Sequence, residues 1–452
     1  MIEKIKDHLR TILPESFILW THKIRGMAAA MMYGFPGRKL KVIGVTGTNG
    51  KTTTCNMIAK ILERANYRVG MATTINFKIG KDEWANTSKM TTLSPFVLQK
   101  FLSNCLKAGC HWIVLETSSH GIAQYRNFGI DYSMAIMTNI THDHLDYHKT
   151  FEEYKNTKAK LFSTGQTINI LNQDDKSIEY FQTLPAKDLV TYGAEPQHGQ
   201  RTGYGVENPD EGRKGRADII AKKIILESTG SMFTVVTPNS QIGINLKLPG
   251  KFNIYNALAA LSVVYVLKIH LDVAKQALEE MEGVPGRMEQ VDLGQSFAVI
   301  IDYAHSPDSL EKVYQTLEMA KRARLISVLG ACGDRDRSKR PIMGALAGKY
   351  ADVVIVTNED PYTEDAVSII EQVASGVPRG TDPKNPKIMN ENFFKILDRH
   401  EAIEKAINMA YKDDIVIITG KGAEECMVVG HEKIPWSDKK IAKEILLDRM
   451  QG

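Results

Sequence analysis

In the first half of the chain, short apolar runs rich in β-branched residues alternate with amphipathic stretches. The runs at 42–45, 112–115, 134–137 and 168–171 have the length of buried strands, and apolar residues recur with helical spacing over 55–65. Strands that alternate with helices form βαβ units, and these units build a parallel sheet with helices on both faces. The pattern predicts an α/β protein with a doubly wound parallel sheet.

The pattern changes between 184 and 248, where Gly, Asn and charged residues separate strands such as 231–236. We interpret this stretch as a β-hairpin excursion within the same domain. A second α/β block follows, and the turn Gly283–Gly286 ahead of it has the composition of a hinge. The strands predicted in this block are 298–301, 325–329, 353–356 and 415–418. We therefore expect a short helical segment at 1–40, a central domain at 41–283 and a C-terminal domain at 284–452.

A glycine-rich turn joins the first predicted strand to the first predicted helix. It reads Gly44-Val-Thr-Gly47-Thr-Asn-Gly50-Lys51-Thr52, so the spacing from the first to the last glycine is one residue longer than in the general Walker pattern. Glycines let the backbone wrap around phosphate oxygens, helix N–H groups donate to them, lysine adds a point charge and threonine can hold Mg²⁺. The turn predicts a nucleoside triphosphate site.

Length, charge and cysteine content narrow the class of protein. A chain of 452 residues fits two or three α/β-sized domains. With 57 basic and 53 acidic residues, its formal net charge of +4 gives no footprint of a nucleic-acid-binding protein, so small anions are the expected partners. The five cysteines are odd in number and lack paired metal-ligand spacing, which favours a reducing cytoplasm over a disulfide framework.

The segment ahead of the P-loop is apolar and basic. Its apolar stretches at 17–20 and 27–33 are separated by His22, Lys23 and Arg25, which fits neither a signal peptide nor a membrane span. A helix of this kind either makes contact with a membrane surface or a partner, or packs against the nucleotide domain. Both interpretations stay open at this point.

Two groups of polar residues follow predicted strands, at the sheet edge where α/β proteins bind ligands. Glu116 follows the strand at 112–115, and Thr-His-Asp-His144-Leu-Asp-Tyr-His148 follows the strand at 134–137. Carboxylate and imidazole groups there could bind Mg²⁺, although imidazole is an uncommon ligand for so hard an ion. A single histidine beside a strand is more often a surface or core residue. Three histidines and two aspartates within seven residues favour a functional site.

With these segments in view, the chain resembles the Mur ligase family, and within it the branch that adds the third amino acid to a UDP-N-acetylmuramoyl dipeptide. The resemblance covers roughly residues 40 to 430. It implies a P-loop central domain followed by a Rossmann-like C-terminal domain. The motifs that carry it are Gly-Thr-Asn-Gly-Lys-Thr-Thr (47–53), Thr91-Thr92, Glu116-Thr-Ser-Ser-His-Gly, Asp143-His-Leu-Asp-Tyr-His148, Leu248-Pro-Gly-Lys-Phe-Asn-Ile-Tyr-Asn256, Gly286-Arg287-Met-Glu289, Asp302-Tyr-Ala-His-Ser-Pro307, Gly333-Asp-Arg335-Asp336 and Gly420-Lys421-Gly422.

This resemblance implies ATP-dependent amide ligation. A substrate carboxylate attacks the γ-phosphate, an incoming amine captures the acyl phosphate, and ADP and phosphate leave. Lys51 and Thr52 would hold the phosphates and the first Mg²⁺, and Glu116 and His144 the second metal. A lysine carbamylated by CO₂ supports that metal in the family, and the match to Tyr-Lys-Asn-Thr-Lys places it at Lys158; without the family, Lys158 would be an ordinary exposed helix lysine. The implied catalytic residues are Lys51, Lys158, His144 and Glu116, and the implied metal ligands are Thr52, Glu116, His144 and Lys158.

The resemblance also assigns substrate contacts. For the nucleotide these are Gly47, Thr48, Asn49, Gly50, Lys51, Thr52, Thr53, Asn256, Arg287 and Asp302. For the muramoyl peptide they are Thr91, Thr92, Ser118, Gln124 and Arg126, of which the last two would otherwise be a solvated loop. Arg335 matches the residue that grips the carboxylate of the incoming amino acid, a task that suits a guanidinium fork. Gly420 and Glu424 match the end of that pocket, although Gly-Lys-Gly-Ala-Glu-Glu replaces the usual Gly-Lys-Gly-His-Glu-Asp.

Two departures from the family pattern concern the substrates. Members that add diaminopimelate carry Asp-Asn-Pro-Arg, whose arginine pairs with the distal carboxylate, whereas this chain has Glu359-Asp360-Pro361-Tyr362. These residues disfavour a second carboxylate and tolerate a distal ammonium, which predicts L-lysine or another diamino acid. The segment 1–40 is too short for the family's uridine-binding domain, which we expect to be reduced or absent, so the donor carrier stays open.

Two other interpretations also stay open. One is a related ligase of the same superfamily, such as a folylpolyglutamate synthase or a pseudomurein peptide ligase. The other is a non-catalytic ATP-binding scaffold, which has no chemical need for Lys51, Thr52, Glu116, His144 and Lys158 together. We expect a cytoplasmic monomer that acts on small molecules (ATP, a muramoyl-dipeptide nucleotide and an amino acid) with Mg²⁺ and without nucleic acid.

Overall fold

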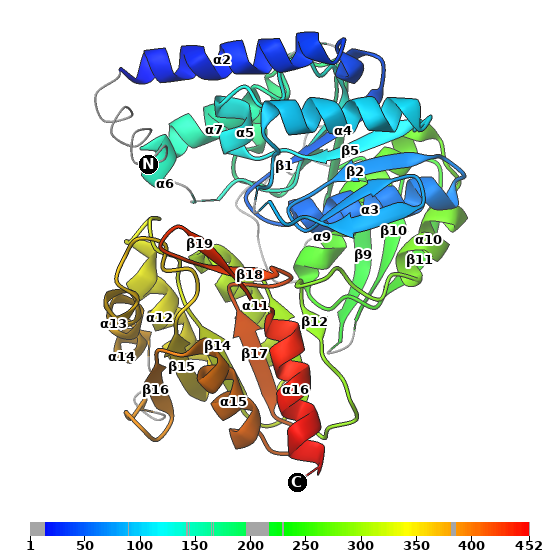
Figure 1. Ribbon diagram of the computed structural model, residues 1–452. Coiled ribbons are helices and arrows are strands. Elements are labelled where there is room, and N and C mark those ends of the chain that lie inside the picture. Colours follow the sequence, from blue (N-terminus) through cyan, green and yellow to red (C-terminus); the bar gives the residue numbers. More distant parts are fainter. Residues whose placement is uncertain are drawn as a thin grey trace.

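The computed structural model describes residues 14–451, apart from 89, 142, 144, 164, 166, 196–216, 228–229 and 381–385. An eleven-stranded sheet and a six-stranded sheet follow one another along the chain and occupy separate halves of the molecule (Figure 1). The long sheet carries the P-loop. The short sheet carries the motifs from Asp302 onward.

The long sheet has the strand order β11-β10-β9-β8-β7-β6-β1-β5-β2-β3-β4. Its strands are β1 (Lys41–Thr46), β2 (Val69–Ala72), β3 (Asn76–Ile79), β4 (Asp82–Ala85), β5 (Trp112–Glu116), β6 (Tyr132–Met137), β7 (Ile168–Asn172), β8 (Asp188–Ala194), β9 (Ile219–Leu226), β10 (Ser231–Val236) and β11 (Gln241–Leu246). The strands from β9 to β2 are parallel, and antiparallel strands extend both edges. The predicted hairpin excursion is therefore an extension of this same sheet.

Alternating residues of each central strand enter different cores, as the pleat requires. In β1, Ile43 and Val45 face one core and Val42 faces the other. The first core is covered by α3 (Lys51–Arg64), α9 (Lys251–Leu267) and α10 (Leu271–Glu279). The second core is covered by α4 (Pro95–Lys107), α5 (Ser119–Ala123), α7 (Phe151–Ala159) and α8 (Ile178–Gln182). The remaining helical elements of this half are α2 (Glu15–Met32), η1 (Pro36–Arg38) and α6 (Leu145–His148).

The short sheet has the order β12-β13-β17-β14-β15-β16, and all but β12 run parallel. Its strands are β12 (Glu289–Gln290), β13 (Ala298–Asp302), β14 (Leu325–Leu329), β15 (Val353–Thr357), β16 (Phe393–Ile396) and β17 (Ile415–Thr419). One core lies under α11 (Pro307–Ala320), α12 (Lys339–Tyr350), α13 (Ala366–Ala374) and α14 (Val377–Gly380), and the other under α15 (Arg399–Met409) and α16 (Asp438–Gln451). A separate hairpin is formed by β18 (Cys426–Val429) and β19 (Glu432–Pro435).

Every strand predicted from an apolar run is present, and the α/β fold class is confirmed. The predicted helix at 55–65 begins earlier, at Lys51, because the P-loop threonines continue the helix. The short strands β2, β3, β4, β12, β16, β18 and β19 were not predicted, since two to four residues carry too little periodicity to identify. The longer strands β8, β9 and β11 lie in the stretch 184–248, where the sequence analysis named only 231–236 as a strand. Among the described helices, none is long and apolar enough to cross a bilayer.

Candidate functional site

The P-loop is packed so closely that two of its glycines accept no side chain. A Cβ on Gly47 would lie 1.9 Å from Thr138 Oγ1, and one on Gly50 would lie 2.2 Å from Asn256 Oδ1. Gly50 also has a left-handed backbone, with φ of 81°, and it is the N-cap of α3. The loop therefore presents the first N–H groups of α3 to a ligand, which suits phosphate oxygens.

Two lysines, the half-buried Lys51 and the buried Lys158, meet at this loop. Lys51 Nζ donates to Gly47 O at 3.0 Å and Thr48 O at 2.8 Å, and Lys158 Nζ, from α7, donates to the same Gly47 O at 2.9 Å. Lys158 is only 1% exposed, so it is not an ordinary surface lysine. Burial and the Lys51 ammonium lower the pKa of Lys158 well below its usual range, and burial also lowers the pKa of Lys51. The neutral amine, the form that reacts with CO₂, is thus favoured at Lys158.

Glu116, at the end of β5, lies between the P-loop and the substrate side. Its Oε2 accepts from Thr52 Oγ1 at 2.9 Å and from the Thr74 backbone N–H at 2.8 Å, and its Oε1 accepts from Thr74 Oγ1 at 2.9 Å. Arg287 Nη2 also donates to Thr52 Oγ1, at 3.3 Å. A P-loop hydroxyl beside a carboxylate that is 3% exposed offers the hard oxygen donors that Mg²⁺ prefers.

The proposed metal ligand His144 lies outside the described residues. Within the described ranges, no group of three or more His, Cys, Asp and Glu residues is arranged to hold a metal ion. The fit of a cation therefore rests on the adjoining oxygens of Thr52 and Glu116 and on the chemistry of Lys158.

A cleft of about 1340 Å³ separates the two halves of the molecule beside the P-loop. Of the predicted nucleotide contacts, Gly47, Thr48 and Lys51 are not part of its lining, whereas the others line it: Asn49, Gly50, Thr52, Thr53, Asn256, Arg287 and Asp302. Asn49 Nδ2 donates to Asp308 Oδ2 on α11 at 2.5 Å, so the P-loop contacts the C-terminal half directly. Residues from both halves thus surround one volume large enough for a nucleotide.

Asp302 has a structural role at this cleft. Its two oxygens accept from the backbone N–H groups of Met288 and Ala304, both at 2.7 Å. Burial raises the pKa of Asp302, while the Arg287 guanidinium opposes that shift. The carboxylate therefore fixes the backbone around Arg287 as well as facing the cleft.

The residues predicted to contact the muramoyl peptide form one hydrogen-bond network. Thr92 Oγ1 lies 3.1 Å from Ser118 Oγ, and Arg126 Nη1 donates to Thr92 O at 2.7 Å. Arg126 also donates to Gln124 Oε1, and Thr91 Oγ1 accepts from Thr74 Oγ1 at 3.0 Å. Because Thr74 holds Glu116, this network is continuous with the P-loop.

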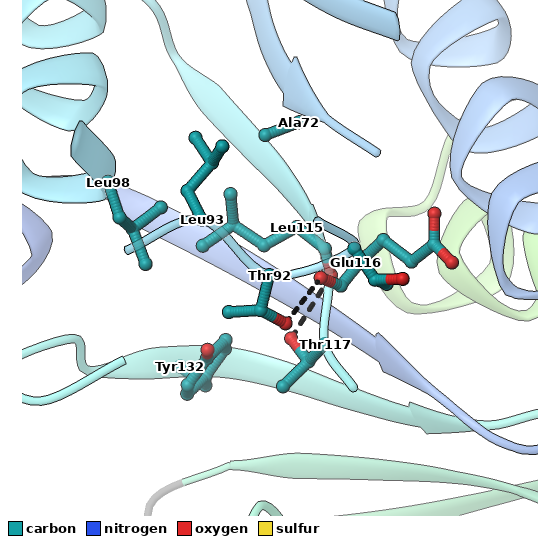
Figure 2. Close-up of a pocket in the computed structure, with 9 residues that line it drawn as sticks. Ala72, Thr92, Leu93, Leu98, Leu115, Glu116, Thr117 and Tyr132 are labelled. Atoms are coloured by element: carbon teal, nitrogen blue, oxygen red, sulfur yellow. Dashed lines mark hydrogen bonds between the residues drawn. The ribbon is translucent and has the colours of Figure 1, made fainter. Parts of the chain in front are cut away.

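Figure 2 shows Thr92 directed at the carboxyl end of β5, beside Glu116 and Thr117. Apolar residues, including Leu93 and Leu98, surround a cavity there of about 10 Å³. That volume is about one water molecule, so it does not hold a substrate. The small cavity lies beside Thr92, and the muramoyl peptide would bind outside it.

A second polar group, the acceptor cluster, is formed by Arg335, Glu359, Asp360, Tyr362 and Glu424. The Arg335 guanidinium lies 5.1 Å from the centre of the Tyr362 ring. Gly420 lies directly beside the Glu359 carboxylate. The structure therefore brings together the residues that sequence matching assigned to the incoming amino acid.

The acceptor cluster is less acidic than its sequence suggests. The buried Lys421 ammonium pairs with Asp360 Oδ1 at 2.9 Å and Glu424 Oε2 at 2.6 Å. Glu359 is 2% exposed, and among the described residues its Oε2 has no hydrogen-bond partner, while its Oε1 accepts from Cys332 Sγ at 3.1 Å. Burial raises the pKa of Glu359. The carboxylate left for a ligand is thus Glu359, and Asp360 is compensated within the protein.

We call the predicted muramoyl-peptide contacts the donor network. One residue of this network and one of the acceptor cluster act on the same histidine, His120. Burial, followed by the charges of His148, Arg126 and Arg335, lowers the pKa of His120 to about 4. Arg126 lies in the long-sheet half and Arg335 in the short-sheet half. Both guanidinium groups are therefore close enough to His120 to act on the same imidazole.

Three supporting residues were missed from the sequence. Thr74 holds Glu116, Asp308 receives Asn49, and Lys421 compensates Asp360. Thr74 follows the carboxyl end of β2, which would have identified it had that short strand been predicted. Lys421 was visible inside the Gly-Lys-Gly motif, but its partner is distant in sequence.

Comparison with known proteins agrees with this geometry. The Mur ligase middle domain model matches residues 45–264, and the model named Mur ligase, glutamate ligase domain matches residues 286–422. A Bacillus cereus protein named UDP-N-acetylmuramoyl-L-alanyl-D-glutamate--2,6-diaminopimelate ligase is 38% identical over 448 residues, covering 97% of this chain and 85% of that protein. The chain belongs to the Mur ligase family.

Solved structures support the assignment to the Mur ligases. A structure of a UDP-N-acetylmuramoyl-L-alanyl-D-glutamate--2,6-diaminopimelate ligase aligns with a TM-score of 0.60 and 31% identity, covering 91% of this chain and 79% of that one. The folylpolyglutamate synthase of Mycobacterium tuberculosis aligns with a TM-score of 0.69 at 18% identity, covering 94% of both chains, which shows the shared fold alone. This Mur ligase is an enzyme, an ATP-dependent ligase that forms amide bonds.

Proposed function

We propose that this Mur ligase adds L-lysine or another diamino acid to UDP-N-acetylmuramoyl-L-alanyl-D-glutamate, as the third residue of a peptidoglycan precursor. The observation that carries the proposal is the position of Glu116. Its carboxylate joins the P-loop hydroxyl of Thr52 to Thr74, and through Thr74 to the donor network of Thr91 and Thr92. A γ-phosphate on the P-loop would therefore lie next to a carboxylate held by that network.

The reaction proceeds in two displacement steps. A donor carboxylate oxygen forms a bond to the γ-phosphorus, the bond to the ADP oxygen breaks, and ADP leaves. The amine nitrogen then attacks the acyl carbon, phosphate leaves, and the amine loses a proton. Lys51 counters the phosphate charge, and the N–H groups of α3 and Arg287 hold the nucleotide on both sides of the cleft.

The proposed cofactor is Mg²⁺, held by Thr52, Glu116, His144 and a carbamylated Lys158. When bound, it screens the negative charge of the phosphates. The support for carbamylation is the burial of Lys158, the lowered pKa of its amine and its place beside Lys51. A carbamate would turn this buried amine into an oxygen donor suited to a hard metal.

The choice of amino acid rests on the acceptor cluster. The Bacillus cereus relative is named for diaminopimelate, which carries a second carboxylate. In this chain the Arg335 guanidinium is available for one carboxylate, whereas Lys421 is already paired with Asp360 and Glu424. The unpartnered Oε2 of Glu359 suits a distal ammonium and repels a distal carboxylate. These charges favour lysine over diaminopimelate.

The test is phosphate release by the purified protein with ATP, Mg²⁺ and the UDP-muramoyl dipeptide, comparing L-lysine, L-ornithine and diaminopimelate. We expect turnover that requires both the dipeptide and an amine, with lysine preferred, and mass spectrometry should show one added residue. ATP binding without turnover would support the scaffold interpretation. Faster turnover with diaminopimelate would reject the lysine assignment and leave the ligase assignment standing. We expect the reaction to take place in the cytoplasm.

A further inference from the structure

Helix α2 carries an uncovered apolar stripe along its outer face. Its members are Phe17, Trp20, Ile24, Met27 and Met31, which are 45%, 57%, 41%, 39% and 65% exposed. They follow one another at intervals of three and four residues, so they lie on one side of the helix. The stripe therefore runs nearly the whole length of α2, from Glu15 to Met32.

The opposite face of α2 holds it against the protein. Gly26, Ala29 and Ala30 are buried there, and a Cβ on Gly26 would lie 2.6 Å from Tyr125 O. Only small residues allow this approach, so the helix cannot roll over to bury its large side chains. The sequence left open whether this helix packs against the nucleotide domain or contacts a membrane or a partner. In the structure, α2 packs on its domain through one face and leaves a second apolar face exposed.

The charged residues beside the stripe indicate what kind of surface binds the outer face of α2. Lys23 and Arg25 flank the stripe on its two sides and are exposed, and the one acidic residue of α2 is Glu15, at its first position. In a pairing with a second copy of this helix, the two cations of each copy would meet at most one carboxylate, at the far end of the other helix. An anionic lipid surface fits both the apolar stripe and the flanking cations. Its acyl boundary takes the aromatic and aliphatic side chains, and its headgroups attract Lys23 and Arg25.

The place of α2 in the molecule permits such a contact. It lies along the outer margin of the long-sheet half, at the end of the molecule away from the short sheet (Figure 1). We propose that the outer face of α2 lies on an anionic membrane surface and holds the ligase there. The proposal concerns the outer face of α2 and does not depend on the amino acid assigned above, although the buried face of the helix contacts Tyr125, which lies between the predicted donor contacts Gln124 and Arg126.

The experiment uses the full chain and lipid vesicles. We expect flotation with vesicles of phosphatidylcholine and phosphatidylglycerol at low salt, and much weaker flotation with pure phosphatidylcholine or at high salt. The double variant W20Q/I24Q should lower the partition coefficient at least about tenfold. The double variant K23S/R25S should lower it by roughly fivefold for each charge removed. The double variant M319Q/I342Q, which changes two exposed apolar residues of the short-sheet half, is the matched control.

Fluorescence locates the contact on the helix. Lipids brominated near the headgroup should quench the protein, and the quenching should be lost in W20F but kept in W84F, which removes another exposed tryptophan. Absence of flotation with anionic vesicles would overturn the proposal. So would light scattering that shows a dimer which W20Q/I24Q converts to a monomer, because the occupant would then be a second copy. Unchanged thermal unfolding of W20Q/I24Q separates lost binding from lost folding.

Discussion

Two buried glutamates occupy similar places in the two sheets and differ in every contact. Glu116 ends β5 and is 3% exposed, and Glu359 follows β15 and is 2% exposed. Glu116 Oε2 accepts from Thr52 and Thr74 and its Oε1 from Thr74, whereas Glu359 Oε2 accepts from no residue in the part of the chain that the structure describes. Since burying a charge without partners is costly, the second arrangement makes sense where a ligand supplies the missing donor.

We assign the two glutamates to two parts of the proposed reaction, phosphate transfer and the choice of the amine. The phosphate side, around Glu116, is satisfied by the protein itself, which suits a chemistry that depends on fixed positions. On the acceptor side as we propose it, the Glu359 oxygen that has no partner among the described residues would meet the substrate, which suits selection among amines. Variation in specificity is therefore expected at Glu359 and Tyr362.

The largest effect should follow from breaking the phosphate side at Lys51. Lys51→Ala removes the ammonium that faces the phosphates, and we expect kcat for phosphate release to fall by about 10²–10³-fold. Steady-state kinetics of phosphate release measures this. Lys60→Ala changes an exposed lysine of the same helix and should leave kcat unchanged. Equal kcat for Lys51→Ala and the natural protein would contradict the proposed role.

On the acceptor side, Lys421→Ala should destabilise the fold. It leaves the buried carboxylate of Asp360 and its neighbour Glu424 without their cation, which costs about 3 kcal/mol or more in the free energy of unfolding. Urea denaturation followed by circular dichroism measures the loss. Lys412→Ala, at an exposed lysine of the same half, should change stability by less than about 0.5 kcal/mol. Similar midpoints for the two variants would mean that the buried pair contributes nothing.

A substitution at Tyr362 sharpens the comparison by changing selectivity alone. Tyr362→Arg adds a cation beside the acceptor cluster, and we expect the ratio of kcat/KM for diaminopimelate to that for lysine to rise at least about tenfold. Competition between the two amines in one reaction, read by mass spectrometry, measures the ratio. Tyr362→Phe keeps the ring without the charge and should leave the ratio near its original value. An unchanged ratio in Tyr362→Arg would show that this position does not face the distal group.

The smallest effect concerns pH. Burial, followed by the Lys339 charge, lowers the pKa of His305 from 6.5 to about 4. Between pH 6.5 and 4 the unfolded chain binds more protons than the folded chain, so the free energy of unfolding should fall as the pH is lowered through this window. His305→Asn should make that fall shallower when unfolding is measured at several pH values. His400→Asn, at an exposed histidine, is the control, and equal slopes for both variants would reject the assignment.

Much of this protein was determined by short stretches of sequence. The apolar runs predicted nine strands that are all present, because a buried parallel strand needs only a few consecutive β-branched residues. The P-loop was equally local, since glycines, lysine and threonine in one turn define a phosphate site. The candidate residues of the donor network were also found, through motifs that follow strands.

Only the tertiary structure decided which of these groups are charged, paired or exposed. Lys158 and Gly47 are 111 positions apart, and Asp360 and Lys421 are 61 apart, so no window of sequence shows their contacts. The same holds for α2, because its sequence shows one apolar face of small residues and one of large residues, whereas the close approach of Tyr125 decides that the small face is buried. Spacing along the chain fixes the backbone, whereas burial and charge compensation depend on groups that folding brings together.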